Sequence, residues 1–222
     1  MASSLLLARE TRALKRLLRH PLPHAGQRDL LAQPWCAALA ARVRRRLAAQ
    51  GVLADDALAV QCTLFDKSPA RNWLVAWHQD LSVPMQGKTN APGWRGWSVK
   101  QGGAFCQPPA DFLQSLLAVR VHIDSCGAGH GPLRVLPASH RLGRLPADQR
   151  IIRTLRTRLG EVACTAAAGD ALLMRPLLVH ASSRMAPQGA DAQAAAGRRR
   201  RVLHFVFAPP ALPAGLRWAV AC

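Results

Sequence analysis

The chain has 222 residues, half of them hydrophobic, which is the size and composition of one globular domain with a substantial core. Its six cysteines are scattered singly with no CxxC pair, which argues against a disulfide framework and against a zinc site. No apolar run approaches the roughly 20 residues that a membrane span needs, and the apolar stretch in MASSLLLARE is too short for a secretory signal. We therefore expect a cytoplasmic protein with reduced thiols and no membrane span.

The charge of the chain is unusual. Thirty basic and 12 acidic side chains give a net charge of +18, and because only four of the 30 are lysine, 26 are arginine. Such an excess attracts nucleic acid, anionic lipid and phosphorylated metabolites, so we expect non-specific binding of polyanions at low salt. The arginines are dispersed along the chain, and this favours drift in composition over a dedicated nucleic-acid function.

The N-terminal quarter of the sequence is predicted to be helical. A basic, leucine-containing segment ends at His20–Pro21, and Pro34 opens a second helix that Gly51 closes. The apolar positions of this second helix recur every four residues, at Trp35, Leu39, Val43 and Leu47. We expect residues 1–56 to pack as a helical segment on a core formed by residues 57–222, within a single domain.

From Ala57 onward the apolar period changes from four to two, which is typical of strands. Strands are predicted at Ala57–Phe65, Asn72–Gln79, Ser115–Asp124, Leu133–Leu136, Glu161–Thr165, Ala171–Met174, Leu177–Ala181 and Val202–Ala208. Between the second and third of these, Ser82–Gly96 is predicted to be a long loop, for which function or mobility is expected. Helices followed by about eight short strands predict a mostly-β fold, a sandwich or jelly roll with flanking helices.

The first candidate for chemistry is His78-Gln79-Asp80, at the end of a predicted strand. Residues i and i+2 of a strand project to the same face about 7 Å apart, so the imidazole and the carboxylate can bind one small ion. One more histidine would complete a two-histidine, one-carboxylate face, which suits non-haem Fe(II). A second pair, His122 and Asp124, precedes a Cys/Gly turn, and a structural, hydrogen-bonded role is favoured for it.

The third ligand should come from a later strand. His180 is the best-placed histidine because it ends the apolar run 177–179 and precedes small residues, although alone it would be interpreted as a core histidine. Four arginines, Arg198 to Arg201, lead directly into an apolar strand, so alternate guanidinium groups point to opposite faces. One of them can enter a pocket and hold a carboxylate with two parallel hydrogen bonds.

With these motifs the chain resembles the phytanoyl-CoA dioxygenase family of Fe(II)/2-oxoglutarate-dependent oxygenases. The resemblance rests on five stretches that occur in the family's order, namely NWLVAWHQD (72–80), WSVK (97–100), GPLRVLPASHR (131–141), ALLMRPLLVHAS (171–182) and RRVLHFVF (200–207). It implies a double-stranded β-helix, the jelly-roll core of cupin-like proteins. It also implies an iron centre with His78, Asp80 and His180 as ligands.

The same resemblance implies a co-substrate pocket. Arg200 would bind the distal carboxylate of 2-oxoglutarate, and Ser182, Gln79 and Trp97 match positions that line the pocket in the family. The interval from His180 to Arg200 is longer than the family's, and the excess is interpreted as an insertion at 189–197. Arg199 and Arg201 are the alternatives if that insertion shifts the register.

The activity that the resemblance implies is hydroxylation of an unactivated carbon of a small organic substrate, with succinate and CO2 as co-products. Fe(II), 2-oxoglutarate and O2 would be required, with ascorbate as reductant in vitro. The basic charge favours an anionic substrate. The alternatives are a basic nucleic-acid-binding β-sandwich, an oxygenase acting on a polyanionic substrate, and a catalytically silent relative that keeps only the fold.

Overall fold

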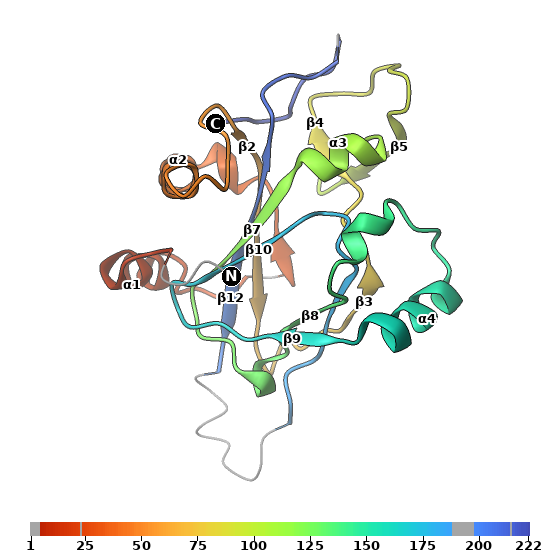
Figure 1. Cartoon of the computed structure of the whole chain (residues 1–222). Helices are drawn as coiled ribbons and strands as arrows, with labels where there is room; N and C mark the ends of the chain where they lie inside the picture. The colour runs from red at the N-terminus through yellow and green to blue at the C-terminus, as the bar shows by residue number, and fades with distance from the viewer. Residues whose placement is uncertain (1–4, 23, 188–197, 214) are drawn as a thin grey trace.

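The computed structural model describes residues 5–22, 24–187, 198–213 and 215–222, so the predicted insertion at 189–197 lies outside the described residues. The described chain is mostly β, with three antiparallel sheets and a few helices (Figure 1). Within these described ranges, none of the helices has the length and apolar character needed to cross a bilayer.

The largest sheet has five strands, and each neighbouring pair is antiparallel. In spatial order the strands are β1 (Gly26–Gln27), β2 (Leu58–Lys67), β12 (Arg200–Ala208), β7 (Leu117–His122) and β10 (Ala171–Met174). β12 lies between β2 and β7, and all nine of its residues are buried. Because both faces of β12 are covered, side chains at alternate positions along it face two different environments.

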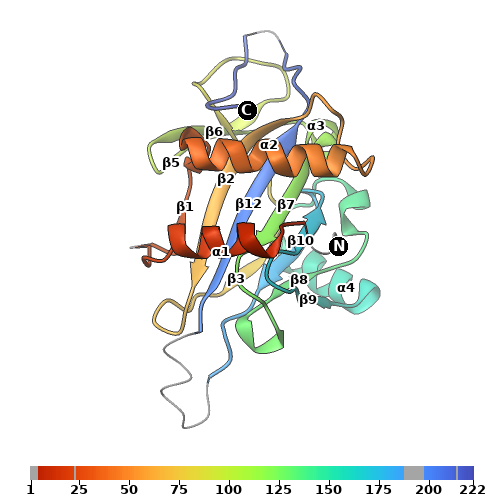
Figure 2. The same ribbon diagram turned by 90° about the vertical axis from the view of Figure 1, so that its left-hand side faces the viewer.

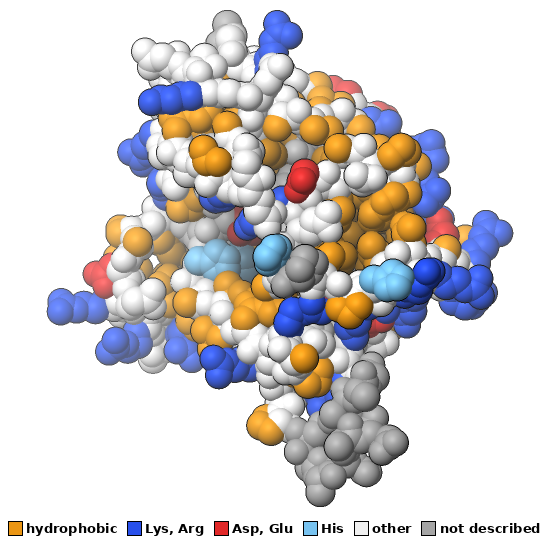
Figure 3. Space-filling model, turned by 180° about the vertical axis from the view of Figure 1, so that it is seen from behind, with side chains coloured by type: hydrophobic (Ala, Val, Ile, Leu, Met, Phe, Trp, Pro, Cys, Tyr) orange, Lys and Arg blue, Asp and Glu red, His pale blue; other side chains and the backbone are white. Residues whose placement is uncertain are grey.

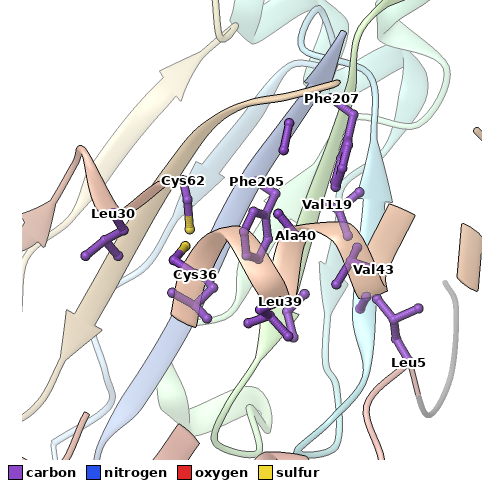
Figure 4. Packing of buried hydrophobic residues seen from close by; sticks show 14 of the residues in the cluster. Leu5, Leu30, Cys36, Leu39, Ala40, Val43, Cys62, Val119, Phe205 and Phe207 are labelled. Carbon is purple, nitrogen blue, oxygen red and sulfur yellow. The ribbon is translucent and has the colours of Figure 1, made fainter. Parts of the chain in front are cut away.

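One face of this sheet is covered by helices α1 (Ala8–Leu17) and α2 (Pro34–Ala48), which run across it (Figure 2). As predicted, α2 has a proline in its first turn and buries its apolar positions Leu39, Val43 and Leu47. These residues belong to the same core cluster as Phe205 and Phe207 of β12 (Figure 4). All six cysteines are free, and no disulfide links them.

Two smaller sheets lie on the other side. The four-stranded sheet contains β3 (Val75–His78), β11 (His180–Ser182), β8 (Leu133–Val135) and β9 (Val162–Cys164), in that order. The three-stranded sheet contains β4 (Val83–Met85), β6 (Gly103–Gln107) and β5 (Arg95–Lys100). The remaining elements are η1 (Leu30–Ala32), α3 (Ala110–Ser115), η2 (Ala128–His130), η3 (Ser139–Leu142) and α4 (Gln149–Leu159).

The structure corrects the prediction of a continuous loop at Ser82–Gly96. This stretch holds β4 and the first residues of β5, which both pair with β6. β4 is only three residues long with a proline at its centre, so it has no local strand signal, and its pairing partner lies about 20 residues further on.

The predicted strand Leu177–Ala181 is shifted, because the structure has a turn before His180, closed by a hydrogen bond from Leu178 N to Arg175 O of 2.9 Å. The apolar run is therefore a buried turn that feeds a short strand. Leu177 and Val179 are completely buried, but they belong to two different core clusters. Their hydrophobicity reports burial and not strand conformation.

Candidate functional site

A pocket of about 470 Å³ is enclosed by residues of all three sheets. His78, Asp80, His180 and Arg200 lie in its wall. Seen from the side opposite to Figure 1, the molecule presents histidine side chains near its centre and Lys and Arg side chains around its edge (Figure 3).

The pairing of β3 with β11 brings the predicted ligands together. His78 and His180 are directly opposite each other in the antiparallel register, with ring centroids 4.2 Å apart. Asp80 follows two residues after His78, and its Oδ1 lies 3.6 Å from His78 Nε2 while its Oδ2 lies 3.7 Å from His180 Nε2. The ligand atoms of the three side chains all lie within 4.8 Å of one another. A single ion can therefore contact all three.

The hydrogen bonds of the two imidazoles occupy Nδ1 and leave Nε2 of each ring available to bind a metal. Nδ1 of His78 lies 2.8 Å from Ala76 O, and Nδ1 of His180 lies 2.8 Å from Leu178 O. A carbonyl oxygen only accepts, so each Nδ1 carries the hydrogen and each Nε2 presents its lone pair to the cluster. Two imidazole nitrogens and a carboxylate oxygen form a donor set that fits a divalent iron ion.

The electrostatics of the site favour a neutral His180 and an ionised Asp80. Burial lowers the pKa of His180 to about 4, so this ring is neutral near pH 7. Burial by itself would raise the pKa of Asp80, but the imidazoles of His180, His78 and His204 around it hold this pKa well below its ordinary value. Burial also acts to lower the pKa of His78, but its hydrogen bond and attraction to Asp80 outweigh this and raise it.

The segment GPLRVLPASHR supports the strand that carries His180. The Ser139 hydroxyl accepts a hydrogen bond of 2.8 Å from Val179 N, and Leu136 N donates to Val179 O at 2.9 Å. Gly131 has a positive φ of 62°, and a Cβ there would lie 2.4 Å from Ser183 O. Only glycine fits this approach, which places Gly131 O against the residues that follow His180.

Arg200, the predicted anchor for a carboxylate, lies in the pocket wall with only 3% of its surface exposed. Its Nη1 donates to Gly131 O, and its Nε has no hydrogen-bond partner among the residues that the structure describes. The predicted pocket residue Ser182 also lines the pocket, and its hydroxyl donates to Gly131 O at 3.3 Å. The two side chains therefore lie next to each other, on either side of the same carbonyl group.

A lysine that the sequence analysis missed completes this end of the pocket. Lys67 pairs with Arg200 in the β2–β12 register, is fully buried, and donates from Nζ to Ser182 Oγ at 3.1 Å and to Ser183 O at 2.5 Å. Burial and the positive charge of Arg200 lower the pKa of Lys67 to about 7. Neither cation has a carboxylate within 4.0 Å among the described residues, which leaves an anion site with no acidic partner.

The alternative arginines face away from the pocket. Arg199 binds Asp66 through two hydrogen bonds of 2.7 Å, and Arg201 binds Asp124 through two of 2.8 Å. The structural role that the sequence favoured for Asp124 therefore agrees with its place in the structure. His122 is buried, and its Nδ1 has no hydrogen-bond partner in the described part of the chain.

For two other predicted pocket residues, Gln79 and Trp97, the structure shows no side-chain group free in the pocket. Gln79 lines the pocket, but its amide is bound to backbone, donating to Gly143 O at 2.8 Å and Leu177 O at 2.7 Å and accepting from Leu145 N at 2.9 Å. Trp97 of β5 packs against the core cluster that contains Val83 and Cys106, and it is not among the described residues that line the pocket. Their contact with a co-substrate stays a prediction.

The structure adds two further buried side chains that the sequence analysis did not single out. Arg120 of β7 and His204 of β12 are opposite each other in the register and both line the pocket. Arg120 Nη1 lies 2.9 Å from His204 Nδ1, and His204 Nε2 lies 3.8 Å from Asp80 Oδ2. Nothing local marks these residues, because they become neighbours of Asp80 only when β12, β7 and β3 are brought together.

Solved structures of low sequence identity share this fold. HygX from Streptomyces hygroscopicus, solved with nickel and 2-oxoglutarate bound, superposes with a TM-score of 0.59 at 15% identity over 94% of this chain and 81% of its own. The epimerase SnoN in complex with Fe3+, alpha ketoglutarate and nogalamycin RO gives a TM-score of 0.64 at 16% identity over 93% and 77%. AviO1 from Streptomyces viridochromogenes Tue57 gives 0.54 at 20% identity over 95% and 89%.

No curated protein matches the chain. The sequence model of the family described as Phytanoyl-CoA dioxygenase (PhyH) matches residues 3–188, which is most of the chain and includes all three residues of the histidine–aspartate cluster. The chain belongs to the phytanoyl-CoA dioxygenase family of non-haem iron and 2-oxoglutarate-dependent oxygenases.

Proposed function

We propose that this chain is an Fe(II)- and 2-oxoglutarate-dependent hydroxylase with His78, Asp80 and His180 as its iron ligands. The observation that carries the proposal is the convergence of these three side chains, with each Nδ1 against a backbone carbonyl oxygen and each Nε2 facing the Asp80 carboxylate. We further propose that the facing antiparallel sheets form a double-stranded β-helix and that residues 1–56 and 57–222 make one domain. Iron would supply the activation of O2 that oxidises an unactivated carbon, with succinate and CO2 as co-products.

The co-substrate would be held at its far end by Arg200, with Lys67 and Ser182. Arg200 and Lys67 pair with each other on neighbouring strands. Arg200 is four residues along β12 from His204, which is close to Asp80. Four residues of a strand span about 13 Å. A dicarboxylic acid can therefore reach from the cationic end of the pocket toward the histidine–aspartate cluster. The guanidinium binds one carboxylate, and its alignment fixes the orientation of the whole molecule.

The rest of the pocket favours a small anionic substrate with an apolar part. Phe105 and Leu116 supply apolar wall, while Lys100 and Arg28 add two more cations to the lining. The hairpin that carries Lys100 is fixed to β1 by hydrogen bonds of 3.1 Å from Arg28 N to Gln101 Oε1 and from Gln101 Nε2 to Gly26 O. Asp80 is the only acid among the described lining residues.

Succinate formation tests the proposed function. The full-length protein with Fe(II), ascorbate and O2 is expected to convert 2-oxoglutarate to succinate slowly by itself and faster with a substrate. Carboxylic acids should stimulate the reaction more than their neutral amides, because the amides do not pair with Lys100 and Arg28. A protein that binds Fe(II) but never releases succinate above a no-iron control would contradict the proposal.

The affinity for a metal is expected to fall as the pH is lowered through the raised pKa of His78. Below this pKa, which lies above the ordinary 6.5, a divalent ion must displace one proton from His78. The affinity should then fall about tenfold per pH unit, with one proton released per ion bound. His180, with its pKa of about 4, adds a second proton only in stronger acid. Calorimetric titration with Mn(II) between pH 8 and pH 6 measures both quantities, and a constant affinity over this range would refute the assignment of His78.

A further inference from the structure

Three imidazoles, not two, surround the Asp80 carboxylate. The Nε2 atoms of His78, His180 and His204 lie 3.6, 3.7 and 3.8 Å from its oxygens. His204 comes from β12, where it pairs with Arg120 on one side and Thr63 on the other. Only 5% of its surface is exposed. Position alone does not say whether this third ring is a ligand.

The hydrogen-bond partners separate the third ring from the other two. Nδ1 of His204 lies 2.9 Å from Nη1 of Arg120, and a guanidinium has donors only. His204 Nδ1 must therefore accept, and a neutral ring then carries its hydrogen on Nε2. This is the opposite tautomer to that of His78 and His180, whose Nδ1 atoms donate to carbonyl groups. Burial and the charge of Arg120 lower the pKa of His204 to about 3, in agreement with a neutral ring.

We infer that His204 is a positioning residue for Asp80, directing an Nε2–H donor at Oδ2, and that Arg120 fixes the tautomer that makes this possible. The inference rests on the proposed function, in which Asp80 is a metal ligand. A lone pair on Nε2 would make His204 a competing ligand; a hydrogen there makes it a donor to the carboxylate. The separation of 3.8 Å is wider than a hydrogen bond, and closing it needs a shift of under about 1 Å.

Arg120 is well suited to this task. It is 6% exposed, it has no carboxylate within 4.0 Å among the described residues, and its guanidinium lies over the Phe65 ring with 5.4 Å between its central carbon and the ring centroid. The ring contact and the strand pairing hold the guanidinium in one place, so His204 has a single donor to accept from. With one Asp80 oxygen engaged by His204, the other oxygen is left to face the metal. Outer partners of this kind contribute about 10- to 100-fold to metal affinity.

The tautomer can be measured in the metal-free protein. In a long-range 15N–1H correlation spectrum of protein labelled at histidine, the signals that disappear in His204→Gln belong to His204. The wild type should show the hydrogen on Nε2 of this ring, and Arg120→Met should lose that single state. A hydrogen on Nδ1 of His204 in the wild type would overturn the inference, whatever the protein binds.

Metal affinity provides the second measurement, with Mn(II) as the probe. His204→Leu is expected to weaken Mn(II) binding 10- to 100-fold. His204→Gln should stay close to wild type, because its Oε1 can accept from Arg120 and its Nε2 can donate to Asp80. Thr63→Val is the matched control, since Thr63 is buried, pairs with His204 in the β2–β12 register and lines the pocket, and among the described residues it has no hydrogen bond to Asp80. Its Mn(II) affinity should not change.

The outcomes separate the two proposals. Wild-type Mn(II) affinity in a folded His204→Leu variant, with binding lost in His180→Ala, overturns the role of His204 and leaves the metal site standing. Unchanged binding in His180→Ala overturns the metal site itself. If His204→Leu does not fold, the tautomer of the wild-type ring still decides the question.

Discussion

Asp80→Ala is expected to reduce iron-dependent succinate release to the level of a no-enzyme control. The substitution removes the only acid among the described residues of the pocket wall, which is also the anionic member of the three-residue cluster. The two imidazoles that remain have no negative charge to offset that of a divalent ion. Residues that only hydrogen-bond to a metal ligand contribute about 10- to 100-fold to metal affinity. Loss of a direct ligand should therefore weaken metal binding by more than about 100-fold. Mn(II) titration and chromatographic succinate assay measure the two effects separately.

Asp124→Asn is the matched control for this experiment. Asp124 is also an aspartate paired with a basic group, but it binds Arg201 through hydrogen bonds of 2.8 Å and is not among the residues lining the pocket. This variant should unfold at a lower temperature and keep its Mn(II) affinity. Succinate release at the wild-type rate in Asp80→Ala would eliminate the assigned iron site, and so would loss of Mn(II) binding in Asp124→Asn alone.

The parts of the site that the sequence predicted are those with a local signature. His78 ends β3 and Asp80 lies two residues further on, so the period of a strand is enough to predict that their side chains lie together. His180 could be found because its flanking residues are apolar on one side and small on the other. Lys67, Arg120 and His204 have no such mark, since each gains its neighbours from the pairing of β12 with β2 and β7, between residues more than 80 positions apart.

The fold shows the same division. The predicted strand Ala171–Met174 has the same bounds as β10, and the predicted strand Val202–Ala208 lies inside β12. Alternating or apolar runs bounded by turn residues can be recognised as strands from the local sequence. Helix α4 was missed although Ile152 and Leu155 are buried on one of its faces. Its four arginines conceal the apolar period of the helix. The residues that it packs against include a tryptophan and others that are distant in sequence. Arg156 and Arg134 lie over the Trp77 ring, at 5.4 and 5.2 Å from its centroid.

Arg200→Gln is expected to raise the KM for 2-oxoglutarate by about 10- to 100-fold, because a hydrogen bond to a charged group contributes about 1.5–3 kcal/mol. Lys67→Met should act in the same direction, since its ammonium shares this end of the pocket through Ser182. The wild type should discriminate strongly against 2-oxopentanoate, which lacks the distal carboxylate, and Arg200→Gln should lose most of that discrimination. Loss of discrimination would show that Arg200 contacts the distal carboxylate, whereas a general loss of stability would affect both acids equally.

The neighbouring arginine supplies the control for Arg200. Arg201→Gln removes the same charge one position along β12, but Arg201 binds Asp124 on the helix-covered side and donates to Lys15 O and Leu18 O at 3.1 and 3.0 Å. It should lower the unfolding temperature and leave the ratio of KM values for the two acids unchanged. Because the strand alternates, only one of the two adjacent arginines can face the pocket. If Arg201→Gln changed the ratio and Arg200→Gln did not, the register of β12 assigned to the co-substrate site would be wrong.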